Sequence, residues 1–288
     1  MKVASGPLIA YLNSGSVFQM ALLYTITLLG GGVYRWTSAD LSIVFGGNTF
    51  TSAIDQGGQP LIQRGPIRTV KGLEVDTLDI TLLCGDTAQI LGGNLTLAAH
   101  NGAFDGARVK VERLFMPSWG DTSLGSLVEF EGAVAGVDPA SQQVILHVMS
   151  DLEKLQLQMP HVLFMPACAN SFGDPACGIV LSTLTATGTA GASTNASQVT
   201  NVTGHVDGYY NLGVIAMTSG PAAGSRRSVR SYLSSVVVPA VPFPIAPASG
   251  DGFSIYPGCQ RTQTACAGWS NSNRFRGCPY VPMPETTR

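Results

Sequence analysis

Cysteine is the residue type whose placement in this chain points most directly to chemistry. Five of the six cysteines lie between residue 168 and the C-terminus, and four of them form two spaced pairs, Cys168 with Cys177 and Cys259 with Cys266. Eight residues separate the members of the first pair and six separate those of the second. Thiolates gathered from two distant segments can form a disulfide framework, bind zinc or bind an iron–sulfur cluster.

Spacing and context bear on each of these three possibilities. A chain of 288 residues, 45% of them hydrophobic, can build its own core, and no convincing secretion signal accompanies the cysteines, which disfavours disulfides. Structural zinc sites usually place paired ligands about two to four residues apart, closer than in either pair here. An iron–sulfur cluster suits thiolates that arrive from several loops, but spacing separates it from zinc only weakly. The residues alone therefore leave the choice open.

The two remaining cysteines lie in different settings. Cys84 follows Leu82 and Leu83 at the expected end of a strand, where a free cysteine is usually a small buried hydrophobic residue. Cys278 lies in Arg276-Gly277-Cys278-Pro279, close in sequence to the second pair. It could replace one of the four ligands or pack as a core thiol.

Other residue types give weaker signals of chemistry. The histidines show no metal-binding spacing, and only His161 is close to a cysteine; the others are His100, His147 and His205. Two carboxylate pairs invite comparison with a glycosidase: Asp79 with Asp86, and Glu129 with Glu131. Carboxylates that alternate with apolar residues more often mark the solvated face of a strand. Because the chain also has no Ser/His/Asp elbow, P-loop or dinucleotide-binding motif, we expect no enzyme active site.

The low charge of the chain is its most unusual compositional property. Charged residues make up 12% of the sequence, against about 25% in an ordinary soluble domain. We expect partners in an assembly to cover much of the surface, unless Ser, Thr, Asn and Gln provide the solubility. The net charge of −2 offers no basic field for nucleic acid. The one basic cluster, Arg226, Arg227 and Arg230, is more typical of a loop or an interface, so no specific nucleic-acid site is expected.

The first 34 residues superficially resemble a signal peptide, because no charged residue follows Lys2 in this stretch. Pro7 and the polar residues 13–16 interrupt the apolar run, and its most apolar part, residues 20–29, alternates as a strand does. No run approaches the roughly 20 apolar residues of a membrane span. We therefore expect neither a cleaved signal nor a membrane span.

The elements that must position the cysteines are mainly strands. A short helix is expected over residues 7–12, with Ser5 as its N-cap. Alternating apolar residues then predict a hairpin of residues 22–29 and 33–36, and another that pairs residues 128–134 with 144–148 across Asp138-Pro139. No long amphipathic helix is present. Residues 1–160 are therefore predicted to form an antiparallel β-barrel or sandwich.

The composition changes after Met159-Pro160, which we take as a domain boundary. Residues 161–288 contain predicted strands at 209–217 and 229–238 and a proline-rich extended segment at 239–247. The tail after residue 250 is rich in Gly, Pro, Cys and aromatic residues but has little periodicity. Such a segment cannot build a core by itself, so we expect a β-rich, loop-rich C-terminal domain held by a covalent or metal cross-link.

These residues also resemble those of a known family. The tail, with Gly258-Cys259-Gln260-Arg261-Thr262, Cys266, Trp269-Ser270-Asn271 and residues 273–280, is similar to the C-terminal signature of the tail-tip hub proteins of long-tailed phages and gene transfer agents. The segment from Cys168 through Phe172-Gly173-Asp174 to Cys177-Gly178 resembles the first cysteine pair of that family. Motifs such as Tyr34-Arg35-Trp36 and Gly46-Gly47-Asn48 extend the resemblance to the N-terminal half.

The resemblance implies a structural role in the virion rather than catalysis. It implies a homotrimeric β hub, assembled in the bacterial host cytoplasm, that joins the distal tail protein to the tail-tip or central fibre protein, with the tape-measure protein as a further partner. It also implies a C-terminal iron–sulfur domain with a 4Fe-4S cluster on Cys168, Cys177, Cys259 and Cys266. The resemblance implies an aromatic residue at the position of Cys278. This chain therefore has a fifth thiol near the expected cluster, and Cys278 is the alternative ligand.

Two other classes of function stay open at this point. One is a secreted, disulfide-stapled, β-rich adhesin or carbohydrate-binding module, and the other is an Fe–S enzyme. An enzyme would need an open coordination position with acid and base residues around it, and the cysteine tail offers only Arg261, Arg274 and Arg276 nearby. Zinc stays the alternative metal.

Overall fold

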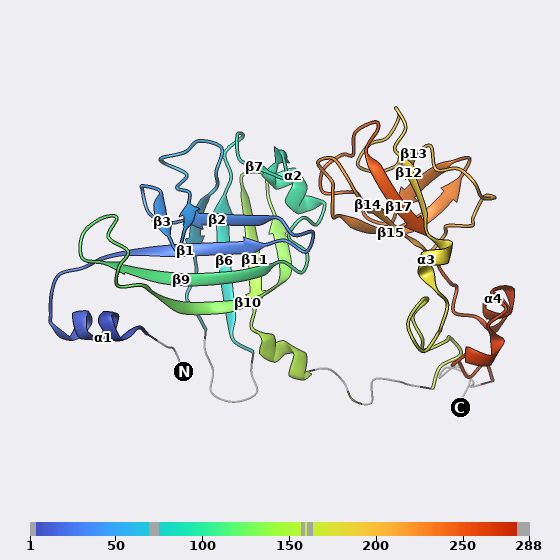
Figure 1. Cartoon of the computed structure of the whole chain (residues 1–288), viewed down its shortest axis with the longest axis horizontal. Helices are drawn as coiled ribbons and strands as arrows, with labels where there is room; N and C mark the ends of the chain where they lie inside the picture. The colour runs from blue at the N-terminus through green and yellow to red at the C-terminus, as the bar shows by residue number, and fades with distance from the viewer. Residues whose placement is uncertain (1–3, 69–74, 157–158, 160–163, 281–288) are drawn as a thin grey trace. The chain divides into compact units, whose positions relative to one another are not determined.

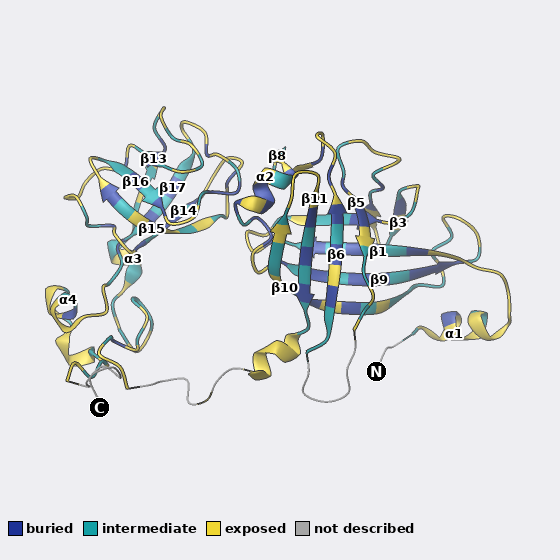
Figure 2. Cartoon of the chain, turned by 180° about the vertical axis from the view of Figure 1, so that it is seen from behind, coloured by how far each residue is buried: buried dark blue, intermediate teal, exposed yellow. Residues whose placement is uncertain are grey.

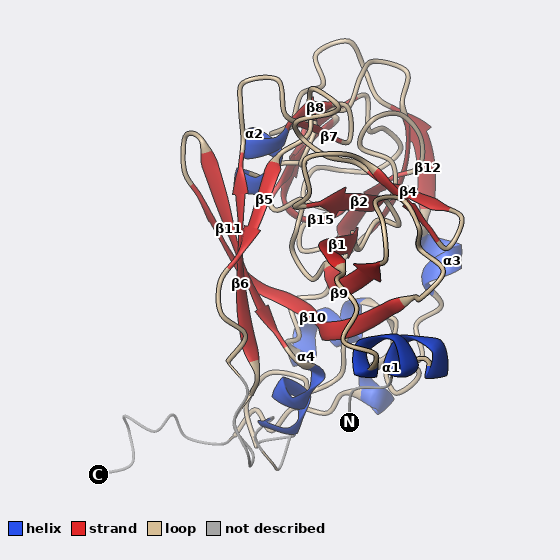
Figure 3. Cartoon of the chain, turned by 90° about the vertical axis from the view of Figure 1, so that its left-hand side faces the viewer, coloured by secondary structure: helices blue, strands red, loops and turns tan. Residues whose placement is uncertain are grey.

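The structure is a computed structural model that describes residues 4–68, 75–156, 159 and 164–280 (Figure 1). Contacts within the chain define two compact units, Met1–Gln156 and Leu157–Arg288, and each is described by itself. Strands are the main regular elements of both units and the helices are short (Figure 3). The prediction of a mainly β protein is confirmed.

The first unit is built on one antiparallel sheet of seven strands. The sheet curls, so that β5 and β6 cross over β1 and β9 with the core between them (Figure 2). In spatial order its strands are β2 (Val33–Thr37), β1 (Gln19–Thr27), β9 (Arg108–Met116), β10 (Ser126–Pro139), β11 (Gln143–Met149), β6 (Thr77–Leu83) and β5 (Leu61–Arg64).

The long strand β10 forms the corner of this sheet. Its first half pairs with β9 and its second half with β11. It therefore belongs to both limbs of the curled sheet, one formed by β2, β1 and β9 and the other by β11, β6 and β5. The register shifts twice, between Val128 and Phe130 and between Val134 and Gly136. A bulge bends its strand and increases the local twist, and the two shifts account for the turn of the sheet at this strand.

The core of the first unit lies between the two limbs. Its strand residues alternate between buried and accessible, as expected for a sheet with one covered face. Burial of each large aliphatic side chain contributes about 1.5–3 kcal/mol. The fully or almost fully buried side chains include Tyr24, Ile26, Leu78, Ile80, Leu82, Phe104, Val109, Val111, Val144, Leu146 and Val148.

Short elements complete the first unit. Helix α1 (Gly6–Asn13) begins after Ser5, whose Oγ accepts a hydrogen bond from the Leu8 N–H at 3.2 Å, so the predicted helix and its N-cap are confirmed. The hairpin of β3 and β4 packs Ile43 and Phe50 on the second face of β1. The other elements are β3 (Ile43–Phe45), β4 (Asn48–Phe50), β7 (Gln89–Ile90), β8 (Gly93–Asn94), α2 (Leu95–His100) and η1 (Asp151–Gln156).

The predicted hairpin around Asp138-Pro139 is correct in its second half only. Val134 does pair with β11, opposite Val148, but Phe130 pairs with β9 instead of β11. Asp138 and Pro139 belong to the ladder, opposite Ile145 and Val144, and the turn follows them. The prediction erred because β10 is long enough to serve two neighbours, and an Asp-Pro pair at a strand end resembles a turn.

The second unit is an antiparallel sheet of six strands with irregular segments at its end. In spatial order the strands are β12 (Ala186–Thr189), β17 (Gly252–Tyr256), β14 (Val214–Met217), β15 (Arg226–Leu233), β16 (Val236–Pro239) and β13 (Val199–Thr200). Its core includes Tyr210, Ile215, Val229, Phe243 and Ile255. The helical elements are α3 (Leu181–Leu184), α4 (Gln263–Gly268) and η2 (Ser272–Arg274).

The single strand predicted over residues 229–238 is in fact a hairpin. Ser234 and Ser235 have φ angles of 49° and 64°, and two successive residues with positive φ form the tight turn that joins β15 to β16. Asparagine and glycine usually mark such a turn, and neither occurs here. Because Ser234 and Ser235 are not typical of this type of turn, the sequence showed no turn between the two strands.

Gly132 on β10 provides a test of the packing at the corner. A Cβ there would collide with the backbone carbonyl of Met149, whereas a Cβ at Gly136 on the same strand would lie 3.6 Å from the His147 ring. We expect Gly132→Ala to lower the free energy of unfolding by about 1–3 kcal/mol, because backbone must shift to relieve the overlap. Gly136→Ala is the matched control. Equal urea midpoints for the two variants would contradict the packing described.

A second test concerns the pH dependence of the sheet. His147 on β11 lies between Asp79 of β6, at 2.7 Å from Nδ1, and Asp138 of β10, at 2.9 Å from Nε2. Hydrogen bonds that the His147 ring donates to Asp138 and then to Asp79 raise the pKa of His147. The stabilisation is therefore complete below the unfolded pKa of about 6.5 and is lost as the pH rises through the raised folded value.

We expect wild type to lose more stability than His147→Asn between about pH 5.5 and about pH 9. Urea unfolding of both proteins at the two pH values measures this difference. Because the His147 side chain is 38% exposed, solvent screening keeps the effect small. The expectation fails if the two proteins change in parallel.

Candidate functional site

Four cysteines of the second unit meet around one small cavity. Cys168 and Cys177 lie in the irregular segment before α3, Cys259 follows β17, and Cys266 lies on α4. The cavity has a volume of about 20 Å³. It is lined by Cys168, Asn170, Phe172, Cys177, Cys259, Arg261, Thr262, Cys266, Asn271 and Arg274. The structure therefore brings together the four cysteines predicted as ligands.

Helix α4 fixes the position of Cys266. The helix begins after Thr262, whose Oγ1 accepts a hydrogen bond from the Ala265 N–H at 3.2 Å. This cap directs the first turn of the helix, and Cys266 follows on its buried side. Cys266 is the one member of the four on a regular element; the other three are positioned by loops.

Hydrogen bonds between irregular segments hold those loops together. The Cys168 N–H donates to the Arg261 carbonyl at 2.8 Å, and the Ala169 N–H donates to the Arg276 carbonyl at 3.2 Å. These bonds join the segment of the first cysteine pair to that of the second. Asp174 shapes the first segment, since its carboxylate accepts from the backbone N–H groups of Ser171 and Cys177.

Asn271 connects the two cysteine pairs most directly. Its Nδ2 donates to the carbonyl of Cys177 at 2.8 Å, and its backbone N–H donates to the carbonyl of Cys266 at 3.0 Å. The Cys266 thiol in turn donates to the Asn271 carbonyl at 3.1 Å. The side chain of Asn271 thus holds a cysteine of the first pair and its backbone holds one of the second.

Three of the four sulfurs accept N–H groups. The Arg261 N–H points to Cys259 Sγ and the Arg276 N–H to Cys168 Sγ, each at 3.3 Å. Asn271 Nδ2 lies 3.6 Å from Cys177 Sγ. Donors of this kind stabilise negative charge on sulfur and are typical of iron–sulfur sites.

The electrostatics of the site reflect how close the thiols are. Burial raises the pKa of Cys266, and the neighbouring Cys168, Cys259 and Cys177 raise it further in that order. Like charges in one cavity repel, so four thiolates need positive charge to compensate them. The guanidinium groups of Arg261 and Arg274 line the same cavity but are mostly exposed.

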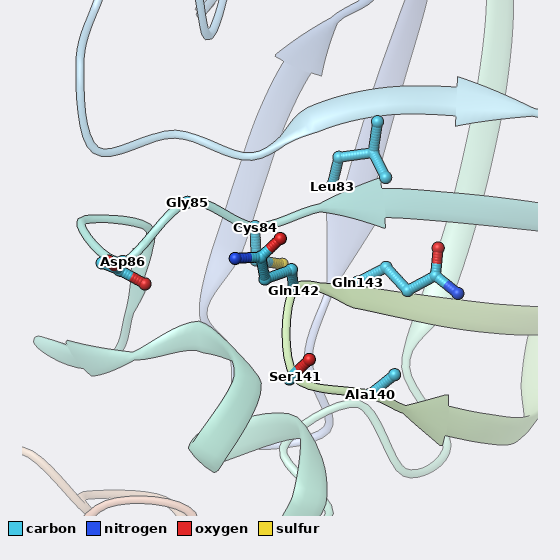
Figure 4. Close-up of a pocket in the computed structure, with 8 residues that line it drawn as sticks. All are labelled: Leu83, Cys84, Gly85, Asp86, Ala140, Ser141, Gln142 and Gln143. Atoms are coloured by element: carbon cyan, nitrogen blue, oxygen red, sulfur yellow. The ribbon is translucent and has the colours of Figure 1, made fainter.

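The remaining cysteines and the histidines do not line this cavity. Cys278 is half-buried, and its N–H donates to the Met165 carbonyl at 2.8 Å. Cys84 is buried in the first unit at the end of β6, beside an open cavity (Figure 4). Burial raises the pKa of its thiol. His205 stacks on Tyr209 with ring centroids 3.8 Å apart, and His161 lies outside the described residues.

The arrangement differs from that of a site for one ion. In the described part of the chain, no three His, Cys, Asp or Glu side chains are grouped closely enough to hold a single metal ion. All six cysteines are free. The four thiols thus share a cavity without the tight grouping that one zinc ion would need.

Two further contributors to the site were not predicted to position the cysteines. Asn271 bridges the cysteine pairs, and the rings of Phe172 and Trp269 meet with centroids 5.2 Å apart, which packs the first segment against the second. All three lie in the motifs that resemble the hub family, within five residues of a cysteine. That proximity was the available signal.

Comparison with known proteins identifies the family. Residues 5–180, more than half of the chain, match the family described as baseplate hub protein, N-terminal attachment domain. The chain belongs to this family. Residues 208–285 match a second family, described as phage conserved hypothetical protein BR0599. The first match includes Cys168 and Cys177, and the second includes Cys259 and Cys266.

A solved structure shows where the hub fold recurs. The chain is similar to one in the virion of a native gene transfer agent particle, with 23% sequence identity and a TM-score of 0.75. The similarity covers 98% of this chain and 94% of the other. The two chains therefore share a fold over both units. A comparison with curated proteins finds no match. None of the described helices of the hub protein is long and apolar enough to cross a membrane.

Asn271 provides a test of how the thiols are held. We expect Asn271→Ala to increase the reaction rate of Cys177 and Cys266 with a thiol reagent several-fold in metal-free protein. The reason is that loss of a buried hydrogen bond costs about 1–3 kcal/mol and frees both segments. Labelling followed by peptide mass spectrometry measures each site. Asn273→Ala, at an exposed position two residues away, is the control, and equal rates in both variants would refute the bridging role.

Proposed function

We propose that this protein is a structural hub in the tail tip or baseplate of a phage or gene transfer agent, and that its second unit holds a 4Fe-4S cluster. The family match over residues 5–180 is the observation that carries the hub assignment. A hub protein of this family is a component of the virion, in its tail or baseplate. The fold shared with a chain of a gene transfer agent virion supports the same assignment.

The proposed role is to link the distal tail protein to the tail-tip or central fibre protein, as a homotrimer, with the tape-measure protein nearby. The matched family is described as an attachment domain, which suits the first unit as the part that joins the tail. Large apolar side chains are exposed in its N-terminal region, with Val17 at 89%, Met20 at 53% and Leu29 at 83%. Such residues, in a chain with 12% charged residues, favour a surface that neighbours cover.

The proposed cluster ligands are Cys168, Cys177, Cys259 and Cys266. The donor set fits, because four thiols line one cavity and three accept N–H groups, while neither histidine nor carboxylate is among the lining residues. The cavity between the thiols is small, about 20 Å³, so we expect the cysteine loops to adjust when a cluster binds. Three of the four cysteines lie on loops, which permits this adjustment.

When bound, the cluster would supply four metal–thiolate cross-links and a one-electron redox centre. The residues of the chain orient the thiolates and shield them. The backbone N–H groups of Arg261 and Arg276 and the Asn271 amide stabilise charge on sulfur, and Phe172 against Trp269 covers the junction. The cross-links would order a segment with little apolar core, as structural metals do in small domains.

We propose a structural rather than an enzymatic role for this site. General acid–base catalysis needs a titratable group within reach of a substrate. The described residues that line the cysteine cavity offer thiols, amides, a hydroxyl and two guanidinium groups, but no His, Asp or Glu. Zinc is the alternative metal.

Anaerobic purification of the full chain tests the cluster. We expect a brown protein with a broad absorbance band near about 400 nm and about four irons per chain. Cys168→Ala and Cys259→Ala should abolish the band, because each removes one of four ligands. Cys84→Ala, which changes a thiol in the other unit, should leave it intact.

The same preparation separates the alternatives. One zinc per chain, or three disulfides by mass spectrometry, would refute the cluster and leave the hub assignment standing. If Cys278→Ala removes the band while Cys266→Ala retains it, Cys278 is the fourth ligand instead of Cys266.

A separate measurement tests the assembly. We expect the purified chain to form a trimer with a mass of about 90 kDa, three times the 30.0 kDa of one chain. Light scattering coupled to size-exclusion chromatography measures the mass. Co-expression with the distal tail protein of the same particle should give a co-purifying complex, and a monomer that does not bind it would refute the linking role whatever the metal content.

A further inference from the structure

A buried charged group lies beneath the edge of the first sheet. The Glu129 side chain, only 7% exposed, contacts Arg113 Nη2 at 2.6 Å and Arg64 Nη2 at 3.1 Å. These residues come from β10, β9 and β5, so both limbs of the curled sheet contribute. The expectation that Glu129 lies on a solvated strand face is therefore wrong: the bulge at residues 128–130 places its side chain toward the core.

This group carries more positive charge and more hydrogen-bond donors than it uses. Among the described residues, two guanidinium groups face this one carboxylate, which leaves one unit of positive charge in a partly buried place, with the Arg64 and Arg113 side chains 20% and 32% exposed. Within the described residues, three buried atoms of this group form no hydrogen bond. Two are donors, Arg64 Nε and the hydroxyl of the fully buried Tyr24, and the third is Glu129 Oε2, whose contact is the ion pair with Arg64. Buried donors without partners are costly, and a bound group that accepts hydrogen bonds from them would remove that cost.

The Tyr24 hydroxyl stays protonated and can therefore donate a hydrogen bond. Burial raises its pKa to about 12, although the positive charge of Arg64 and the nearby Ser38 hydroxyl oppose the rise. The Ser38 hydroxyl is close enough to affect the titration but does not form a hydrogen bond of good geometry with Tyr24. Tyr24 therefore keeps its proton at physiological pH and can donate it to an acceptor.

A cavity of about 570 Å³ adjoins these donors. It is lined by six consecutive residues, from Leu61 to Pro66, and by Leu22, Tyr24 and Ser38. Side chains alternate between the two faces of a strand, so a cavity bordered by consecutive residues runs along the strand edge. Within the part of the chain that the structure describes, strand β5 is the last of its sheet and pairs on one side only, with β6.

We propose that this cavity is a docking groove for an extended polypeptide segment that carries an Asp or Glu side chain. The segment adds to the free edge of β5, and Arg64 and Tyr24 bind its carboxylate. Strand addition uses the backbone groups of an unpaired edge. The surplus positive charge and the two unmet donors select a carboxylate over a neutral or basic side chain.

The size and walls of the groove favour a peptide over a free small anion. A carboxylate alone would occupy a small part of about 570 Å³ and would leave the apolar side chains of Leu22 and Leu61 uncovered. An extended segment places alternate side chains against those residues while its backbone pairs with β5. The proposal does not depend on the hub assignment or on the metal.

Fluorescence anisotropy with the full-length chain tests the proposal. The probe is the capped peptide Thr-Val-Thr-Asp-Val-Thr with a neutral dye, compared with the same peptide carrying Asn in place of Asp. We expect the Asp peptide to bind about tenfold more tightly, as for the loss of one charged hydrogen bond. Methylation of alternate backbone nitrogens should abolish binding in one of its two registers, because one set of N–H groups faces the edge of β5.

Variants distinguish a binding role from a structural one. Tyr24→Phe keeps the ring and removes only the unpartnered hydroxyl, so we expect an unchanged urea midpoint and about threefold to tenfold weaker binding of the Asp peptide. Tyr256→Phe, in the second unit, should bind the peptide as wild type does. If Tyr24→Phe changes stability without changing affinity, the hydroxyl is structural and the proposal fails.

Three other results would also overturn the proposal. Equal affinity for the Asp and Asn peptides would exclude recognition of a carboxylate. Competition by acetate at the same concentration as the peptide would reduce the site to one for small anions. If no probe binds up to about 1 mM, the weak limit of specific association, the ion pairs of Glu129 with Arg113 and Arg64 only link strands within the sheet.

Discussion

The second unit depends on hydrogen bonds between two irregular segments that are about ninety residues apart in sequence. Bonds such as Cys168 to Arg261 and Asn271 to Cys177 close this distance without the ladder of a sheet. Closing so long a loop costs conformational entropy, and the cost grows only slowly with length. A few hydrogen bonds and one aromatic contact are a modest compensation, so a cross-link at the four thiols would contribute where the local packing is weakest.

The first unit contains a buried ion group that links the two limbs of its sheet. This unit encloses a core by curling one sheet about the corner strand β10, and Glu129 with its two arginines ties the limbs together at the open side. A buried ion group of this kind contributes little net stability, because desolvation offsets attraction. Its retention beside an unpaired strand edge is better explained by specificity for what binds there than by stability.

Much of the fold and of the site could be predicted from local pattern. Alternation gave β1 and β2, Ser5 gave the start of α1, and the cysteine spacing picked out the residues that line the cavity. The features that the sequence did not predict share one cause. The bulge before Phe130, the turn at Ser234 and Ser235 and the bridge by Asn271 are set by backbone conformation and by partners distant in sequence, and neither leaves a period or a composition that a single sequence displays.

Several of the few charged residues in this chain form internal ion pairs. The first unit directs several of its charged residues inward or into pairs on one sheet, including Glu112, which is 8% exposed and accepts from Ser126 and Lys110. Its carboxylate is thus buried although Lys110, its partner on the same strand, is 40% exposed. Charges committed to internal pairs cannot keep a surface soluble. A protein with few charges, several of them internal, and with exposed apolar side chains near its N-terminus is therefore adapted to a particle in which neighbouring subunits cover its surface.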